Sequence, residues 1–283
     1  MQTISTIQDL RIWREGIKGS LGFVPTMGAL HDGHLSLVAE SKKICSQTVV
    51  SIYLNPLQFS PDEDLEIYPQ NLEADFEALS DFEIDVVFLP DKSEMNPDGF
   101  NTNLQETKLS IILEGKSRPS FFRGVTTVLA KLFNIVRPTH AFFGEKDAQQ
   151  LLIVKKMVKD MAYPINIIAC PIIRQDNGLA MSSRNSYLSE EEQESASKIY
   201  RALQDGKNLI ISGERHAQTI REQITKTINQ ESILRIDYIS VADAETLIEI
   251  SGNIERKVLV STAVFLGETR LIDNFNYSVS TSK

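Results

Sequence analysis

The segment LGFVPTMGALHDGHLSLVAESKKIC, residues 21–45, contains the pattern that decides the fold. Residues 21–25 are a short apolar run that is typical of a buried strand. Residues 34–45 place Leu35, Val38 and Ala39 on one face of a helix. The turn PTMGALHDGH (25–34) joins the two, so this segment predicts the first strand and helix of an alternating α/β fold.

The alternation of short apolar runs and helical patterns continues to about residue 173. Further strands are predicted at 49–55, 84–90, 140–144 and 165–173, and helices at 72–82, 123–137 and 148–161. Helices of this length between strands indicate a parallel sheet that is covered on both faces. In such sheets, ligands bind beyond the carboxyl ends of the strands.

The pattern changes after Arg174. The sequence QDNG (175–178) predicts a turn, and SEEE (189–192) has the Ser-x-x-Glu spacing of a capping box. The expected elements that follow are helices from about 189 to 207 and 215 to 229, then strands at 235–241, 257–265 and 270–273. We therefore expect a larger α/β domain over 1–174 and a smaller α+β domain over 175–283.

Composition excludes several classes of protein. Among 283 residues, 29 Lys and Arg oppose 38 Asp and Glu, and a net charge of −9 argues against a general nucleic-acid or membrane-surface binder. No apolar run is long enough to span a membrane, and the start lacks the apolar core of a secretion signal. Cys45 and Cys170 form neither a disulfide framework nor a zinc spacing, and we interpret them as small apolar residues. A cytoplasmic enzyme is the expectation.

Two of the four histidines, His31 and His34, lie in the turn between the first strand and its helix. The N-terminus of a helix offers backbone N–H groups and the positive end of its dipole, which suit an anion. Gly33 lets the backbone approach a ligand closely. The alternatives are two exposed histidines in a turn, or a zinc site, for which His-x-x-His without a third ligand is weak support.

Two further turns carry groups that suit phosphate. GEKDAQQ (144–150) follows a strand. Its Lys146 is a cation at a helix N-terminus, where the positive end of the helix dipole disfavours it unless an anion is bound there. Asp147 and Gln150 have the spacing of a capping box, which is the simpler explanation for those two residues. MSSRN (181–185) offers two hydroxyls and a guanidinium in succession, or is only a surface loop followed by a cap.

YLNPLQF (53–59) places two neutral amides, Asn55 and Gln58, at the end of a strand, where they could bind a hydroxyl and a carboxylate. Three of the four patches follow strands, so one crevice could collect them, with MSSRN closing it from the second domain. Histidine, lysine, serine and arginine together suit a triphosphate better than metal or acyl-serine chemistry.

The same segments resemble the pantothenate synthetases, the ligases of the HIGH-motif nucleotidyltransferase superfamily that join pantoate to β-alanine. The resemblance rests on FVPTMGALHDGH, YLNPLQF, FRGVTTVLAKLFN, FGEKDAQQL and MSSRNSYLS, in the order and spacing of that family. HxGH at 31–34 resembles the superfamily's ATP signature and MSSR at 181–184 its second signature. The lysine that leads the second signature is replaced by Ala180, so Lys146 and Arg184 would supply the charge.

The resemblance implies a Rossmann-like N-terminal domain, a smaller C-terminal lid, a homodimer, and a pantoyl-adenylate intermediate with release of AMP and pyrophosphate. It implies an ATP site lined by Met27, Gly28, Ala29, Leu30, His31, Asp32, Gly33, His34, Gly144, Glu145, Lys146, Asp147, Ile173, Met181, Ser182, Ser183 and Arg184. Catalytic roles fall to His31, His34, Lys146, Ser182, Ser183 and Arg184, with His34 as a proton donor. Gln58 and Gln150 would bind pantoate, with Asn55 nearby. Mg²⁺ would accompany ATP, with Asp75 as a contact.

The nearest rival is a nucleotidyltransferase that uses the same HxGH site on a phosphate acceptor, but the neutral Gln58 and Gln150 argue against such an acceptor. A tRNA synthetase lacks support, because no basic RNA-binding domain follows the core. A nucleotide sensor without catalytic activity is the alternative from another class. The long loops at 55–71 and 90–103 are expected to cover a water-sensitive intermediate.

Overall fold

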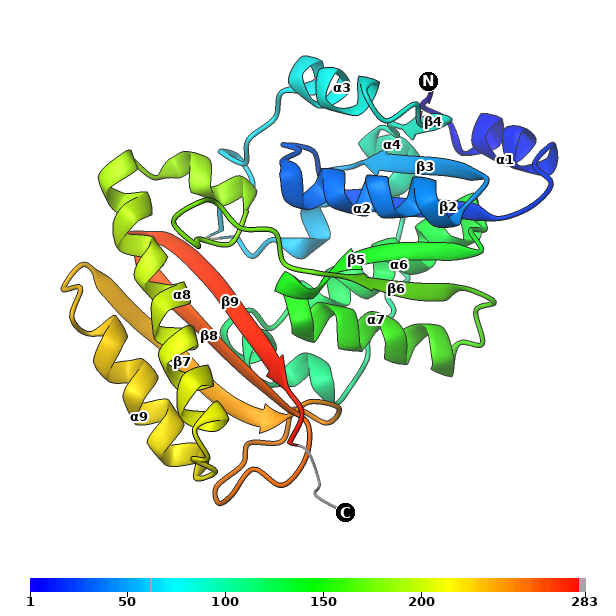
Figure 1. The fold of residues 1–283 in the computed structure, drawn as a ribbon. Helices are drawn as coiled ribbons and strands as arrows, with labels where there is room; N and C mark the ends of the chain where they lie inside the picture. The colour runs from blue at the N-terminus through cyan, green and yellow to red at the C-terminus, as the bar shows by residue number, and fades with distance from the viewer. Residues whose placement is uncertain (62, 280–283) are drawn as a thin grey trace. The chain divides into compact units, whose positions relative to one another are not determined.

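The computed structural model describes residues 1–61 and 63–279, and the chain divides into two compact units (Figure 1). The N-terminal unit comprises residues 1–111, 115–145 and 150–172. The C-terminal unit comprises 112–114, 146–149 and the chain from Ile173 onward. Within the described ranges, no helix has the length and apolar character needed to cross a membrane.

The N-terminal unit contains a six-stranded parallel sheet with the strand order β1-β4-β3-β2-β5-β6. Its strands are β1 (Gln2–Ile4), β2 (Leu21–Thr26), β3 (Gln47–Ile52), β4 (Val86–Phe88), β5 (His140–Gly144) and β6 (Asn166–Cys170). Its longer helices are α1 (Ile7–Glu15), α2 (Asp32–Ile44), α3 (Leu72–Ser80), α6 (Phe121–Val136) and α7 (Ala148–Asp160). Shorter turns are η1 (Pro56–Gln58), α4 (Lys92–Met95), η2 (Leu109–Ile111), α5 (Glu114–Ser117) and η3 (Glu145–Asp147).

Both faces of this sheet are covered, because successive side chains of a strand point to opposite faces. In β2, Phe23 packs into a core with residues of α6 and α7, whereas Val24 packs into a second core with residues of α2 and α3. Val49 and Val50 of β3 divide in the same way. The continuous apolar runs of the sequence therefore follow from burial on two faces.

The strand order reverses direction at β2, which has β3 on one side and β5 on the other. β2 pairs with β5 at Gly22–His140 and Phe23–Ala141, and beyond that pairing β2 continues to Thr26 and β5 to Gly144. The loops that leave the carboxyl ends of these two strands lead to different helices. This is the switch point at which open α/β sheets bind ligands.

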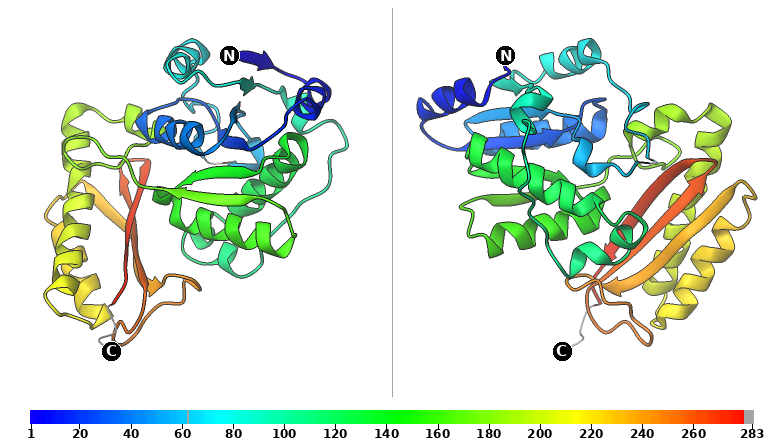
Figure 2. Two further views of the ribbon diagram at one scale, coloured as in Figure 1. Left: turned by 45° about the vertical axis from the view of Figure 1, so that its right-hand side comes forward. Right: turned by 180° about the vertical axis from the view of Figure 1, so that it is seen from behind.

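The C-terminal unit is a three-stranded antiparallel sheet with two helices on one face (Figure 2). Its elements are η4 (Ser183–Tyr187), α8 (Glu190–Ile211), α9 (Ala217–Ile228), β7 (Leu234–Asp243), β8 (Val258–Leu266) and β9 (Thr269–Tyr277). The capping box predicted at the start of α8 is present, since Ser189 and Glu192 bond reciprocally. Ile199 and Leu203 of α8 pack with Ile224 of α9 and Val260 of β8.

The α/β class with a Rossmann-like parallel sheet and a smaller α+β part is confirmed. Several details of the prediction are wrong. β6 ends at Cys170, three residues before the predicted end at 173, and β9 continues to Tyr277, beyond the predicted end at 273. β1 and α1 have no counterpart in the prediction, because three strand residues and an exposed amphipathic helix give a weak pattern. β3 ends at Ile52, three residues before Asn55, which instead begins η1. α8 continues beyond Lys207 to Ile211.

Candidate active site

The loop after β2 ends at His31, the N-cap residue of α2. His31 has extended backbone, with φ −141° and ψ 173°, and its Nδ1 accepts a hydrogen bond from the backbone N–H of Gly33 at 3.1 Å. Because Nδ1 is an acceptor, the proton of the neutral ring is on Nε2. The same ring therefore caps the helix with one nitrogen and carries a donor on the other.

His34 lies one helical turn further on, directly beside His31. The ring centroids are 4.1 Å apart with an interplanar angle of 36°, and the backbone N–H of His34 donates to the carbonyl oxygen of His31 at 2.7 Å. Two imidazoles are thus brought together at the positive end of the α2 dipole, which suits an anionic ligand. Within residues 1–61 and 63–279, no group of three or more His, Cys, Asp and Glu side chains could hold a metal ion.

The turn before His31 has an unusual backbone that a buried carboxylate holds. Gly28 and Ala29 both have positive φ, +84° and +50°. Asp75 of α3, only 3% exposed, accepts from the backbone N–H of Ala29 at 3.1 Å and from that of Leu30 at 2.7 Å. A metal bound by Asp75 would have to share these oxygens with both amides, so the donor set fits a carboxylate that holds a loop better than it fits a metal ligand.

Two of the three amides predicted for the pantoate site, Asn55 and Gln58, contact each other. Asn55 is 1% exposed, and its Nδ2 donates to Oε1 of Gln58 at 2.9 Å and to the carbonyl oxygen of Gly124 at 3.1 Å. A methyl group on Gly124 would lie 2.0 Å from the carbonyl oxygen of Leu57, so only glycine allows α6 to approach η1 this closely.

Arg118 also supports η1, a role the sequence analysis missed. Its Nη2 donates to the carbonyl oxygen of Gln58 at 3.1 Å and to Oε2 of Glu63 at 2.8 Å, and its guanidinium lies 3.8 Å above the ring of Phe121. Gly124 was missed as well. An isolated glycine within the apolar pattern FFRGVTTVL was the signal available for it, since such a glycine often marks close packing.

The turn after β5 runs from Gly144 through η3 directly into α7. Lys146 Nζ lies 3.7 Å from Oδ1 of Asp147, and the side chain of Lys146 is 21% exposed. The carbonyl oxygen of Lys146 accepts from Nδ2 of Asn274 at 2.8 Å, a contact within the C-terminal unit that holds the backbone here. Asp147 is the last residue of a 3₁₀ turn, whereas a capping box requires an extended cap residue. Gln150 is half-buried in the first turn of α7.

In the C-terminal unit, a short hairpin brings Ile173 and Met181 together, since the backbone N–H of Met181 donates to the carbonyl oxygen of Ile173 at 2.9 Å. Ser182 is the N-cap of η4, and its side chain accepts from the backbone N–H of Arg184 at 3.3 Å. Ala180, where the superfamily's second signature has lysine, is buried at 4% exposure.

Arg174 anchors this hairpin to the sheet of the C-terminal unit. Its guanidinium donates to both carboxylate oxygens of Asp273, at 2.6 and 2.9 Å, and lies 4.1 Å from the ring centroid of Tyr200. The Met181–Arg184 segment therefore begins from a rigid base.

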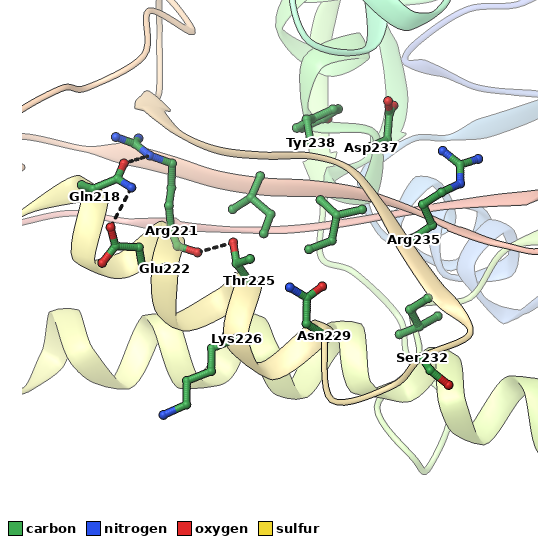
Figure 3. Close-up of a pocket in the computed structure, with 13 residues that line it drawn as sticks. Gln218, Arg221, Glu222, Thr225, Lys226, Asn229, Ser232, Arg235, Asp237 and Tyr238 are labelled. Atoms are coloured by element: carbon green, nitrogen blue, oxygen red, sulfur yellow. Dashed lines mark hydrogen bonds between the residues drawn. The ribbon is translucent and has the colours of Figure 1, made fainter.

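A groove of about 1030 Å³ in the C-terminal unit lies between α9 and β7 (Figure 3). Its lining residues fall between Gln218 and Ile239, whereas the predicted site residues all precede residue 185. Its charges are mixed, and Gln218 bonds to both Arg221 and Glu222. This groove offers no concentrated positive charge and does not compete with the His31–His34 region as a phosphate site.

Comparison with known proteins identifies the family. The family model described as pantoate-beta-alanine ligase matches residues 2–276. A pantothenate synthetase of Thermosipho africanus is 48% identical over 277 residues, which cover 97% of this chain and 99% of that protein. The chain belongs to the pantoate-beta-alanine ligase family.

Solved structures of this ligase family have the same fold. Pantothenate synthetase from Thermus thermophilus superposes with a TM-score of 0.92 at 40% identity, covering 97% of this chain and 99% of that one. The pantoate-beta-alanine ligase of Francisella tularensis, in complex with beta-gamma ATP and beta-alanine, gives a TM-score of 0.80 at 35% identity and 97% coverage of both chains. The family resemblance is confirmed, and with it the assignment of the chain as a ligase.

Proposed function

We propose that this chain joins pantoate to β-alanine in two steps, through a pantoyl-adenylate intermediate, with release of pyrophosphate and then AMP. The observation that carries the proposal is the pair of imidazoles at the N-terminus of α2, directly after the switch-point strand of a pantoate-beta-alanine ligase. A paired donor set at a helix N-terminus suits a polyphosphate.

We assign the ATP-binding role to the loop from Met27 to His34, the segment Gly144–Asp147, Ile173, and Met181–Arg184. His31 and His34 donate hydrogen bonds to phosphate oxygens, and His34 acts as the proton donor. Lys146 and Arg184 supply positive charge, with hydroxyl donors from Ser182 and Ser183. The 4.1 Å ring separation of the histidines supports a shared phosphate ligand for these two residues.

The first step requires no general base. The pantoate carboxylate is ionised at neutral pH. One of its oxygens attacks the α-phosphorus of ATP, and the bond from that phosphorus to the bridging oxygen breaks to release pyrophosphate. Charge repulsion and charge build-up at phosphorus form the barrier, which positioning and cationic donors lower. Gln58 and Gln150 orient pantoate without adding negative charge.

In the second step the uncharged amine of β-alanine attacks the carbonyl carbon of the mixed anhydride. The bond from that carbon to the phosphate oxygen breaks, AMP leaves, and the new amide nitrogen loses a proton. Water competes for the same carbonyl, so we assign the segments 55–71 and 90–103 as covers that exclude it. Asp62, within the first segment, lies outside the described residues.

ATP enters as its magnesium complex, and the phosphates themselves supply oxygen ligands to Mg²⁺. Because ATP is the substrate, we place the reaction in the cytoplasm. A homodimer follows from the family resemblance alone.

The decisive test incubates the purified protein with MgATP, pantoate and β-alanine and measures AMP, ADP, pyrophosphate and pantothenate. AMP and pyrophosphate should form only when pantoate is present, and pantothenate only when β-alanine is added as well. ADP as the product, or AMP formation without pantoate, would contradict the proposal. Transfer of AMP to a phosphate acceptor would favour the rival nucleotidyltransferase.

A further inference from the structure

Asp75 presents a buried carboxylate to the backbone of the loop that precedes His31. The side chain lies in the first turn of α3 and is 3% exposed. Oδ2 accepts from the N–H of Ala29 at 3.1 Å, and Oδ1 accepts from the N–H of Leu30 at 2.7 Å. Hydrogen bonds from backbone amides to a carboxylate are stronger than those to a neutral acceptor.

The loop needs such a partner because its backbone is costly. Ala29 has φ +50°, a left-handed conformation that a side chain disfavours, and it follows Gly28 at φ +84°. Residues in sparsely populated regions persist only where the surroundings over-determine them. A methyl group on Gly28 would lie 3.0 Å from Oδ2 of Asp75, so the carboxylate is packed closely against this turn.

The other end of the turn is held independently. The hydroxyl of Thr26 donates to the carbonyl oxygen of Ser51 at 2.7 Å and accepts from the N–H of Gly28 at 3.3 Å. At the far side, Nδ1 of His31 accepts from the N–H of Gly33. Between these anchors, Asp75 bonds to the backbone amides of Ala29 and Leu30, the two residues that come directly before His31.

We propose that Asp75 is a positioning residue that holds the Gly28–Leu30 turn, with Gly28 and Ala29 at positive φ, and thereby presents His31 and His34 to ATP. The assignment rests on the proposed function, since it takes the α2 N-terminus to bind the nucleotide. It differs from a metal-ligand role, because the carboxylate acts on the loop amides whether or not a cation is present.

The direction in which ATP affinity changes on Asp75→Asn distinguishes a positioning role from a purely electrostatic one. Asp75→Asn keeps the shape of the side chain but places an N–H₂ group against one of the two loop amides, which cannot accept a hydrogen bond from it. If Asp75 acted only through its charge, removing a negative group near a polyanion site would strengthen ATP binding. Under the positioning role the same substitution weakens it.

The experiment measures the Kd of ATP by calorimetry for the wild type and D75N, with Mg²⁺ and with EDTA in its place. We expect the Kd to rise about tenfold in both conditions, with the Kd of pantoate unchanged within about twofold. Glu73→Gln removes an exposed charge from the same turn of α3 and is the matched control, expected to leave both values unchanged. A loss confined to Mg²⁺ would assign Asp75 to the metal, and unchanged or tighter ATP binding would overturn the proposal.

If D75N does not fold, amide hydrogen exchange on the wild-type protein still tests the proposal. The amides of Ala29 and Leu30 should exchange slowly in the free protein and remain protected when MgATP is added. Fast exchange in the free protein, or loss of protection on adding MgATP, would overturn the positioning role. This measurement needs no turnover, so it is separate from the failure of the proposed function, in which the wild type itself would form no AMP.

Discussion

Asn55 Nδ2 donates a hydrogen bond to Oε1 of Gln58 at 2.9 Å, and this contact sets the polarity of the Gln58 amide. With its oxygen bound to Asn55, the Gln58 side chain presents its N–H₂ group as the donor. A donor at this place suits a carboxylate or a hydroxyl oxygen, as pantoate would require. In the proposed pantoate site Asn55 therefore acts through Gln58, and its own Nδ2 also bonds to the carbonyl oxygen of Gly124.

Gln58→Ala should raise the KM for pantoate by about tenfold while the KM for ATP changes little, because it removes a single hydrogen-bond donor from the pantoate site. Steady-state kinetics with each substrate varied in turn gives both values. Asn55→Ala should show the same selectivity together with a loss of stability of about 1–3 kcal/mol, since the buried carbonyl oxygen of Gly124 loses its side-chain donor. Equal losses for ATP and pantoate would show that the pantoate pocket is misassigned.

Gly124→Ala should disturb the proposed pantoate site through η1, which carries Gln58. The added methyl group would lie 2.0 Å from the carbonyl oxygen and 2.4 Å from the carbonyl carbon of Leu57, so η1 must move away from α6. Such overpacking costs about 1–3 kcal/mol of stability, and the displaced Gln58 should raise the KM for pantoate. Gly252→Ala is the control, because a methyl group there meets nothing within 4 Å. Denaturant unfolding and kinetics on both variants make the comparison, and normal behaviour of Gly124→Ala would refute the close approach of α6 to η1.

His34→Ala and Lys146→Ala should each lower kcat/KM for adenylate formation by about 10²- to 10³-fold without unfolding the protein, because each removes a donor to phosphate charge. Pyrophosphate release measures the activity, and circular dichroism checks the fold. His216→Ala is the matched control, since His216 is an exposed residue at the start of α9. Wild-type turnover from His34→Ala or Lys146→Ala would remove that residue from the mechanism.

The elements that the sequence predicted are those with strong periodicity. β2, β5 and α6 were found within two residues because the middle of each strand is buried and α6 buries one face along most of its length. β1 was missed because only one of its three residues is buried. Its formation depends on pairing with β4, which lies far along the chain. Pairing between segments more than eighty residues apart leaves no mark on local pattern.

Residue types at strand ends predicted which side chains make up the candidate site, but not the residues that hold its loops in place. The clustering of His31 with His34 followed from their spacing on a helix. The bond from Ala29 and Leu30 to Asp75 spans 45 to 46 positions, and that from Arg118 to Gln58 spans 60. These contacts depend on how the elements pack, so periodicity could not have revealed them.

The two cysteines give a prediction that depends on pH. Burial raises the pKa of the Cys170 thiol from its ordinary value of 9.0 to about 11, with a smaller contribution from the nearby charges of Glu40 and Glu145. Burial also raises the pKa of Cys45. At pH 9 only about one Cys170 thiol in a hundred should be ionised, so modification by a disulfide reagent should be slow in the native protein and fast in guanidinium.

The same shift affects stability with a definite sign. Because the folded state holds the Cys170 proton to a higher pH than the unfolded state does, the unfolded state binds fewer protons between about pH 9 and about pH 11. The contribution of this thiol to stability is therefore full below pH 9 and is lost as the pH rises through about 11. Urea midpoints measured from pH 7 to 11 should fall more steeply for the wild type than for Cys170→Ala, which has no proton to lose. Parallel curves for the two proteins, or rapid modification of native Cys170 at pH 8, would contradict the buried protonated thiol.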